Sequence, residues 1–183
     1  PLSFLFVAVP GYRRYQKRYC GSSVWWGWPG LPPRAGRKCQ GFMCRRRTLY
    51  EPMDTIELVS LTQGALAIMN PTTPEKVLAA GRAAGLCAGT HVVEVGCGNG
   101  TILALWGQEY GISGVGIEFR PDACRRAGQA FLEAGVGDRI AVRCMDAREY
   151  VPERLFDCAA SIGASHIYGG FSATLDALAG LVT

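Results

Sequence analysis

The segment from Glu94 to Gly100 holds the residues whose types and spacing are best suited to chemistry. It reads Glu-Val-Gly-Cys-Gly-Asn-Gly and overlaps the end of an apolar stretch that predicts a strand over 91–96. Glycines at a strand-to-helix junction permit positive φ angles and let the backbone approach a ligand closely. The helix predicted over 101–111 adds free N–H groups and the positive end of its dipole. The segment therefore predicts a ligand-binding loop that could hold a dinucleotide or S-adenosylmethionine.

The glycine spacing separates these two ligands. The dinucleotide pattern is G-x-G-x-x-G. Counted from Gly96, it needs a glycine at 101, where Thr101 stands; counted from Gly98, it needs one at 103, where Leu103 stands. The chain carries acid-x-Gly-x-Gly-x-Gly instead. An NAD-type nucleotide-binding oxidoreductase is thus an alternative that the spacing disfavours.

This run resembles the first motif of class I S-adenosylmethionine-dependent methyltransferases. The resemblance extends over 53–183, is strongest in 91–146, and covers none of 1–52. It implies that Glu94 pairs with the α-ammonium of the cofactor, directly or through water. It also implies that the loop residues contact the cofactor, namely Gly96, Cys97, Gly98, Asn99 and Gly100.

Two further acids stand where this family places them. Glu118 closes the strand predicted over 114–119, and the resemblance implies that it accepts both ribose hydroxyls. Asp146 closes the strand predicted over 139–147, where the family uses an acid to accept from the adenine amino group. Three acids at the carboxyl ends of consecutive parallel strands favour a ligand over solvated side chains. The remaining cofactor-binding candidates are Phe119, Ala147, Ser161 and Ile162.

The segment 161–170 resembles the small-molecule branch of the family, and Met69-Asn70-Pro71 resembles its cap over the cofactor pocket. His166 is the candidate base if the acceptor must lose a proton, because a histidine pKa lies near working pH. Tyr168 could orient the acceptor or stack on it. The alternative is that both side chains only line the pocket. The adenine-N6 and glutamine branches are disfavoured because no Asp/Asn-Pro-Pro-Tyr/Phe follows the fourth strand, and the cytosine-C5 branch because no Pro-Cys occurs.

Alternating strands and helices must position these residues. Strands are predicted over 91–96, 114–119, 139–147 and 156–164, with helices over 101–111, 121–135 and 172–182 between and after them. This order predicts an α/β fold, a Rossmann-like doubly wound parallel sheet that is incomplete, with about four strands. Two short helices precede it, and the capping-box spacing of Thr72 and Glu75 opens the second. The predicted domains are an extension (1–52), an N-terminal helical cap (53–90) and a partial methyltransferase domain (91–183).

Charge separates the extension from the rest. The chain has a net charge of +4, yet residues 1–52 hold ten Lys or Arg and one acid. No period runs through this segment, so it is expected to be irregular or not native coding sequence. The alternative is a nucleic-acid arm, in which Arg and Lys side chains contact phosphates and aromatic rings stack on nucleobases. Such an arm would make the protein an RNA or protein methyltransferase. No other nucleic-acid partner is expected.

Eight cysteines are scattered through mostly apolar segments, which predicts reduced thiols and a cytoplasmic protein. No metal is expected, because Cys39 with Cys44 and Cys87 with His91 are isolated pairs. The longest apolar run, Leu2 to Val9, is too short to span a membrane, and a signal-peptide pattern is lacking. The oligomeric state stays open.

Complete domains of this class have more strands, including an antiparallel pair at one edge. The sequence is therefore read as truncated after the fourth strand, which would then be an exposed apolar edge. Weak or absent cofactor binding by the isolated chain is expected, and a non-catalytic remnant is a further alternative. The predicted function is in-line methyl transfer from S-adenosylmethionine to a small molecule, in which orientation of the reactants supplies most of the catalysis.

Overall fold

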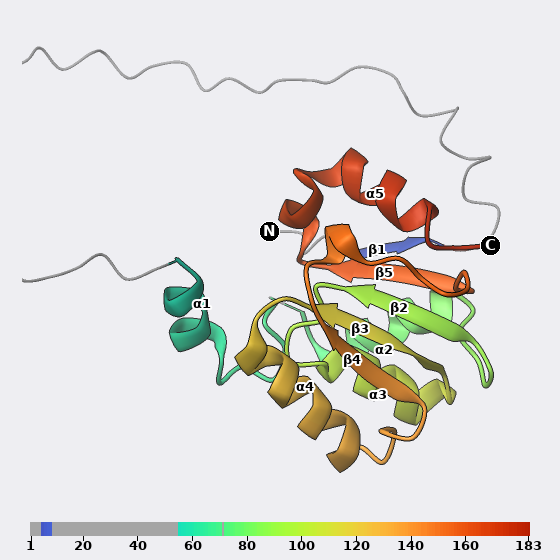
Figure 1. Cartoon of the computed structure of the whole chain (residues 1–183). Helices are drawn as coiled ribbons and strands as arrows, with labels where there is room; N and C mark the ends of the chain where they lie inside the picture. Colours follow the sequence, from blue (N-terminus) through green and yellow to red (C-terminus); the bar gives the residue numbers. More distant parts are fainter. Residues whose placement is uncertain (1–4, 9–54, 71) are drawn as a thin grey trace, which may run out of the picture.

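A five-stranded sheet forms the centre of the structure, a computed structural model that describes residues 5–8, 55–70 and 72–183 (Figure 1). The strand order is β1-β5-β2-β3-β4. The strands are β1 (Leu5–Ala8), β2 (His91–Val95), β3 (Ser113–Glu118), β4 (Ile140–Cys144) and β5 (Cys158–Ile162). Strands β5, β2, β3 and β4 run parallel to one another, whereas β1 is antiparallel to β5. The four parallel strands confirm the predicted α/β class.

Helices cover both faces of this sheet, as the doubly wound prediction requires (Figure 1). On one face, α3 (Thr101–Tyr110) and α4 (Pro121–Glu133) share a hydrophobic core with Val92 of β2. On the other face, α5 (Phe171–Ala179) packs against Val93 and Val95. Successive residues of a strand point to opposite faces, so β2 must be apolar on both.

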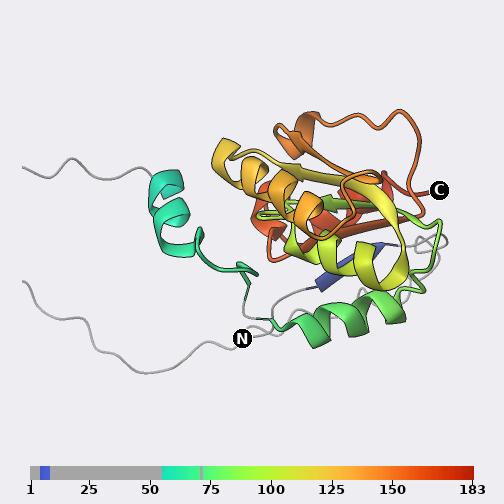
Figure 2. The same cartoon turned by 90° about the horizontal axis from the view of Figure 1, so that it is seen from below.

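The predicted helical cap consists of two helices with different surroundings. The first, α1 (Thr55–Gln63), stands apart from the sheet, while α2 (Pro74–Ala83) lies along α3 (Figures 1 and 2). Trp106 of α3 donates its Nε1–H to the Val77 carbonyl over 2.8 Å, which ties these two helices together. The α2 N-cap is Thr73, whose hydroxyl accepts from the Lys76 N–H over 3.4 Å. The capping box predicted at Thr72 thus lies one residue before the observed cap.

Strand β5 is not an edge, contrary to expectation. Residues Leu5 to Ala8 pair with Ile162 to Ala159 in antiparallel register, so the backbone groups on the outer side of β5 gain partners. The extension was expected to be irregular, and these four residues depart from that expectation by forming a strand. Residues 1–4 and 9–54 lie outside the described residues, and with them the predicted nucleic-acid arm.

In the part of the chain that the structure describes, no helix combines the length and the apolar character needed to cross a membrane.

Candidate functional site

The carboxyl ends of the parallel strands border one cavity of about 620 Å³. It is also lined by the glycine loop and by residues from α1 and the segment that follows it. Most of the sequence-predicted residues lie in this lining: Glu94, Gly96, Cys97, Gly98, Asn99, Glu118, Phe119, Asp146, Ala147, Ile162 and His166. The other three predicted residues, Gly100, Ser161 and Tyr168, are not among the lining residues.

The glycine loop is held against β3 by its own backbone. The N–H groups of Gly96 and Cys97 both donate to the Ile117 carbonyl, over 2.8 and 3.0 Å. Gly96 and Gly98 have φ angles of +71° and +55°. A Cβ at Gly96 would lie 2.4 Å from the Ala164 Cβ, and one at Gly98 would lie 3.2 Å from the Met69 Sδ. Glycine is therefore needed here both for its conformation and for the close approach of neighbouring segments.

Gly100 is closely packed against α4. It precedes α3 with a φ of +75°. A Cβ there would lie 2.8 Å from the Phe131 Cε1 and 2.9 Å from the Ala127 Cβ, both on α4. This glycine lets the start of α3 approach α4.

Glu94 is a buried acid with an unsatisfied oxygen. Its side chain lines the cavity, the residue is 1% exposed, and its Oε2 has no hydrogen-bond partner among the described residues. Burial raises the pKa of Glu94 well above its ordinary value, and the nearby charge of Glu118 raises it further. A cationic group in the cavity would satisfy this carboxylate.

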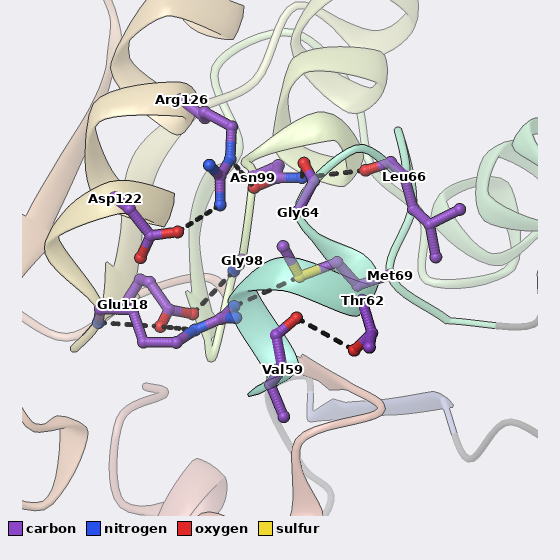
Figure 3. A network of polar contacts seen from close by, with 11 residues as sticks. Val59, Thr62, Gly64, Leu66, Met69, Gly98, Asn99, Glu118, Asp122 and Arg126 are labelled. Atoms are coloured by element: carbon purple, nitrogen blue, oxygen red, sulfur yellow. Dashed lines mark hydrogen bonds and ion pairs between the residues drawn. The ribbon is translucent and has the colours of Figure 1, made fainter. Parts of the chain in front are cut away.

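Glu118 differs from Glu94 because its carboxylate is well supplied with donors (Figure 3). Oε2 accepts from the Gly98 N–H over 3.1 Å. Oε1 accepts from the backbone N–H and the Nε–H of Arg120, each over 3.0 Å. Arg120 is 7% exposed and lines the same cavity, so the ion pair is buried beside the expected ligand.

The cap segment, defined as residues 64–70, closes one side of the cavity. Asn99 donates its Nδ2–H to the carbonyls of Leu66 and Gly64, over 2.9 and 3.4 Å (Figure 3). At the far end of the segment, Asn70 donates its Nδ2–H to the Ile162 carbonyl over 2.6 Å. The cap segment is thus tied to the glycine loop and to the end of β5.

Asp146 follows β4 by two residues and is engaged by Arg148. Its Oδ1 accepts from the Arg148 N–H and Nε–H, each over 2.9 Å. These hydrogen bonds lower the pKa of Asp146 to about 2, so its carboxylate is ionised at neutral pH. Asp146 and Ala147 both line the cavity.

The two predicted acceptor-side residues have different positions. His166 is exposed and lines the cavity beside Ile167. Tyr168 is half-buried and donates its hydroxyl to the Ala147 carbonyl over 3.3 Å. Of these two residues, only His166 is among those that line the cavity. Ser161 is fully buried within β5.

The described cysteines are all free, with Cys97, Cys124 and Cys158 buried and Cys87 and Cys144 exposed. Within residues 5–8, 55–70 and 72–183, no three His, Cys, Asp or Glu side chains gather as they would around a metal ion.

Comparison with known proteins identifies the domain around this cavity. Residues 92–182 match the family model described as a methyltransferase domain. They form a class I methyltransferase domain. The uncharacterised protein YjhP of Escherichia coli (strain K12) is 33% identical over 127 residues, which are 69% of this chain and 51% of YjhP.

Two solved structures are similar to this chain. One is a SAM-dependent methyltransferase from Thiobacillus denitrificans in complex with S-adenosyl-L-homocysteine, with 35% identity and a TM-score of 0.67; the match covers 72% of this chain and 53% of that one. The other, from Geobacter sulfurreducens and also in complex with S-adenosyl-L-homocysteine, has 34% identity and a TM-score of 0.65 over 72% and 52%. The chain spans about half the length of these relatives.

Arg120 is one of the residues lining the cavity that the sequence did not predict, and Arg148 is another. Arg120 follows Glu118 by two positions and is the N-cap of α4. Its side chain makes no capping bond there and turns back to the carboxylate. The only sequence signal was a basic residue close to a strand-end acid, and such residues are most often solvated.

Proposed function

We propose that this chain binds S-adenosylmethionine in the cavity and transfers its methyl group to a small-molecule acceptor. The observation that carries the proposal is the Glu94 carboxylate, which is buried with an unsatisfied oxygen facing no donor among the described residues. An amino acid ammonium group supplies the missing charge and hydrogen bond. The two solved relatives in complex with S-adenosyl-L-homocysteine support this choice of ligand.

The residues around the cavity fit the remaining parts of that cofactor. Gly96 and Gly98 keep side chains out of the loop, which permits close approach of a ligand. Glu118 would hold the ribose, and Asp146 with Ala147 would hold the adenine ring. When bound, the cofactor supplies a methyl group already activated by the sulfonium.

The protein's contribution to catalysis is chiefly orientation. The cap segment, which follows α1, and the segment around His166, which follows β5, both line the cavity. An acceptor held between them would be aligned with the bound cofactor. His166 would take a proton from acceptors that must lose one. A cavity of about 620 Å³ must hold both reactants, which supports a small acceptor. The free cysteines support the cytoplasm as its location.

Calorimetry of the full chain with S-adenosyl-L-homocysteine tests the proposal. The wild-type chain should bind, and Glu94→Gln should weaken the affinity about tenfold or more, because a charged hydrogen bond is lost. Glu109→Gln is the matched control, since Glu109 is exposed on α3 and is not among the lining residues. NAD should not bind. Absence of binding to the wild type, or equal affinity in both variants, would overturn the proposal.

A further inference from the structure

The Glu118 carboxylate has too few free positions to accept two hydroxyl groups. A carboxylate offers about four lone-pair positions. Arg120 fills both positions of Oε1 with its backbone N–H and its Nε–H, and the Gly98 N–H fills one position of Oε2. One position remains, on Oε2. A ribose presents two neighbouring hydroxyls, so the second hydroxyl needs a different partner.

Arg120 offers that partner. Its Nε–H donates to Glu118, and its Nη2 donates to the Met69 Sδ over 3.2 Å, a weak acceptor. Its Nη1 is buried and has no acceptor among the residues that the structure describes. A guanidinium stays protonated and donates through five N–H groups, so a buried Nη1 without an acceptor calls for an oxygen from elsewhere.

We propose that Arg120 binds the cofactor ribose directly, an inference that rests on the proposed function. One hydroxyl donates to the Glu118 Oε2, and the oxygen of the neighbouring hydroxyl accepts from the Arg120 Nη1. The ion pair thereby presents one acceptor and one donor to a vicinal diol. Because the two charges offset each other, the pair suits uncharged hydroxyls better than a phosphate or a carboxylate.

A purely structural role makes a different prediction. If Arg120 only positions Glu118, its removal loosens the contact that Glu118 makes, so Arg120→Met loses sensitivity to the same hydroxyl as Glu118→Ala. If it contacts one hydroxyl, its removal and the removal of that hydroxyl overlap in effect. A double-mutant cycle between protein and ligand separates the two roles.

The experiment measures the affinity of the full chain for S-adenosyl-L-homocysteine and for its 2′-deoxy and 3′-deoxy forms by calorimetry. The wild type should lose roughly tenfold with each deoxy form. Arg120→Met should bind the parent ligand more weakly and should become indifferent to one of the two hydroxyls, whereas Glu118→Ala should become indifferent to the other. Arg125→Met, an exposed position on the same helix, should behave as the wild type.

Three results would overturn the inference. The first is an equal loss in Arg120→Met for all three ligands, or indifference to the same hydroxyl in Arg120→Met and Glu118→Ala; either leaves the proposed function standing. The second is a wild-type chain that is indifferent to both hydroxyls. The third is a wild-type chain that does not bind the parent ligand, which overturns the proposed function as well. If Arg120→Met fails to fold, Arg120→Ala provides the same ratios, because it likewise removes every N–H donor of the side chain.

Discussion

Glu94 and Glu118 line the same cavity, yet their surroundings give their carboxylates different properties. Three N–H groups hold the Glu118 carboxylate in place. Glu94 has an oxygen without a hydrogen-bond partner among the described residues, and burial together with the Glu118 charge raises its pKa. The folded chain therefore favours protonation of Glu94, and a cationic ligand would favour its ionisation.

This difference predicts how stability depends on pH. The folded pKa of Glu94 lies well above 4.5, its ordinary value, so the native state binds more protons than the unfolded state between these two values. The free energy of unfolding contributed by Glu94 should therefore fall as pH rises through that window. Glu94→Gln removes this dependence, so its advantage over the wild type should grow with pH. Urea unfolding of both proteins across the window, without ligand, measures it; parallel profiles would contradict the prediction.

The strand-end acids could be placed from sequence, whereas Arg120 could not. Glu94, Glu118 and Asp146 each close an apolar run, and parallel strands bring their carboxyl ends to one edge. The position of the Arg120 side chain depends on the Met69 sulfur, the start of α4 and the carboxylate together. The contact with Met69 joins segments far apart along the chain, so it leaves no local pattern in the sequence.

Gly100 precedes α3 and packs against α4, so it limits how closely these two helices can approach beside the site. The residue ends the ligand loop and starts the helix behind it. Its positive φ and its contacts with Ala127 and Phe131 both exclude a side chain. Gly85, after α2, has the same φ of +75°, but a Cβ there would meet nothing within 4 Å.

Alanine at these two glycines separates conformation from packing. Gly85→Ala should lower the free energy of unfolding by about 1 kcal/mol, the cost of the left-handed conformation. Gly100→Ala should lower it by about 3 kcal/mol, because overlap with α4 adds to that cost. Urea unfolding of each variant measures the difference. Equal losses would show that α4 accommodates the added methyl group with no further loss of stability.

The order of strands and helices could be predicted from sequence, because apolar residues recur with a different period in β2 to β5 than in the helices. Their ends were less accurate: the strand predicted over 156–164 spans Cys158–Ile162, and the helix predicted over 172–182 spans Phe171–Ala179. The α2 N-cap was placed at Thr72 and not at Thr73, because both threonines offer the same hydroxyl and only the backbone angles of the folded chain choose between them.

At the scale of the whole molecule, the sheet gains a fifth strand, β1, from the opposite end of the chain. β1 is separated from β5 by most of the sequence, and its apolar run gave no sign of its partner. Pairing of this kind depends on which sheet edge is open, a property of the folded domain. The reason given for weak cofactor binding, an exposed β5 edge, therefore does not hold.

Deletion of residues 1–8 should expose the outer backbone groups of β5, since it removes the whole of β1. We expect the free energy of unfolding to fall by about 2 kcal/mol, from several net hydrogen bonds of modest strength, and aggregation to increase. Deletion of residues 1–4 alone is the matched control, because it leaves the paired residues in place. Urea unfolding and light scattering at matched concentrations compare the two chains. If both behave as the full chain does, the β1–β5 pairing contributes nothing to stability, and the sheet must tolerate β5 as an edge.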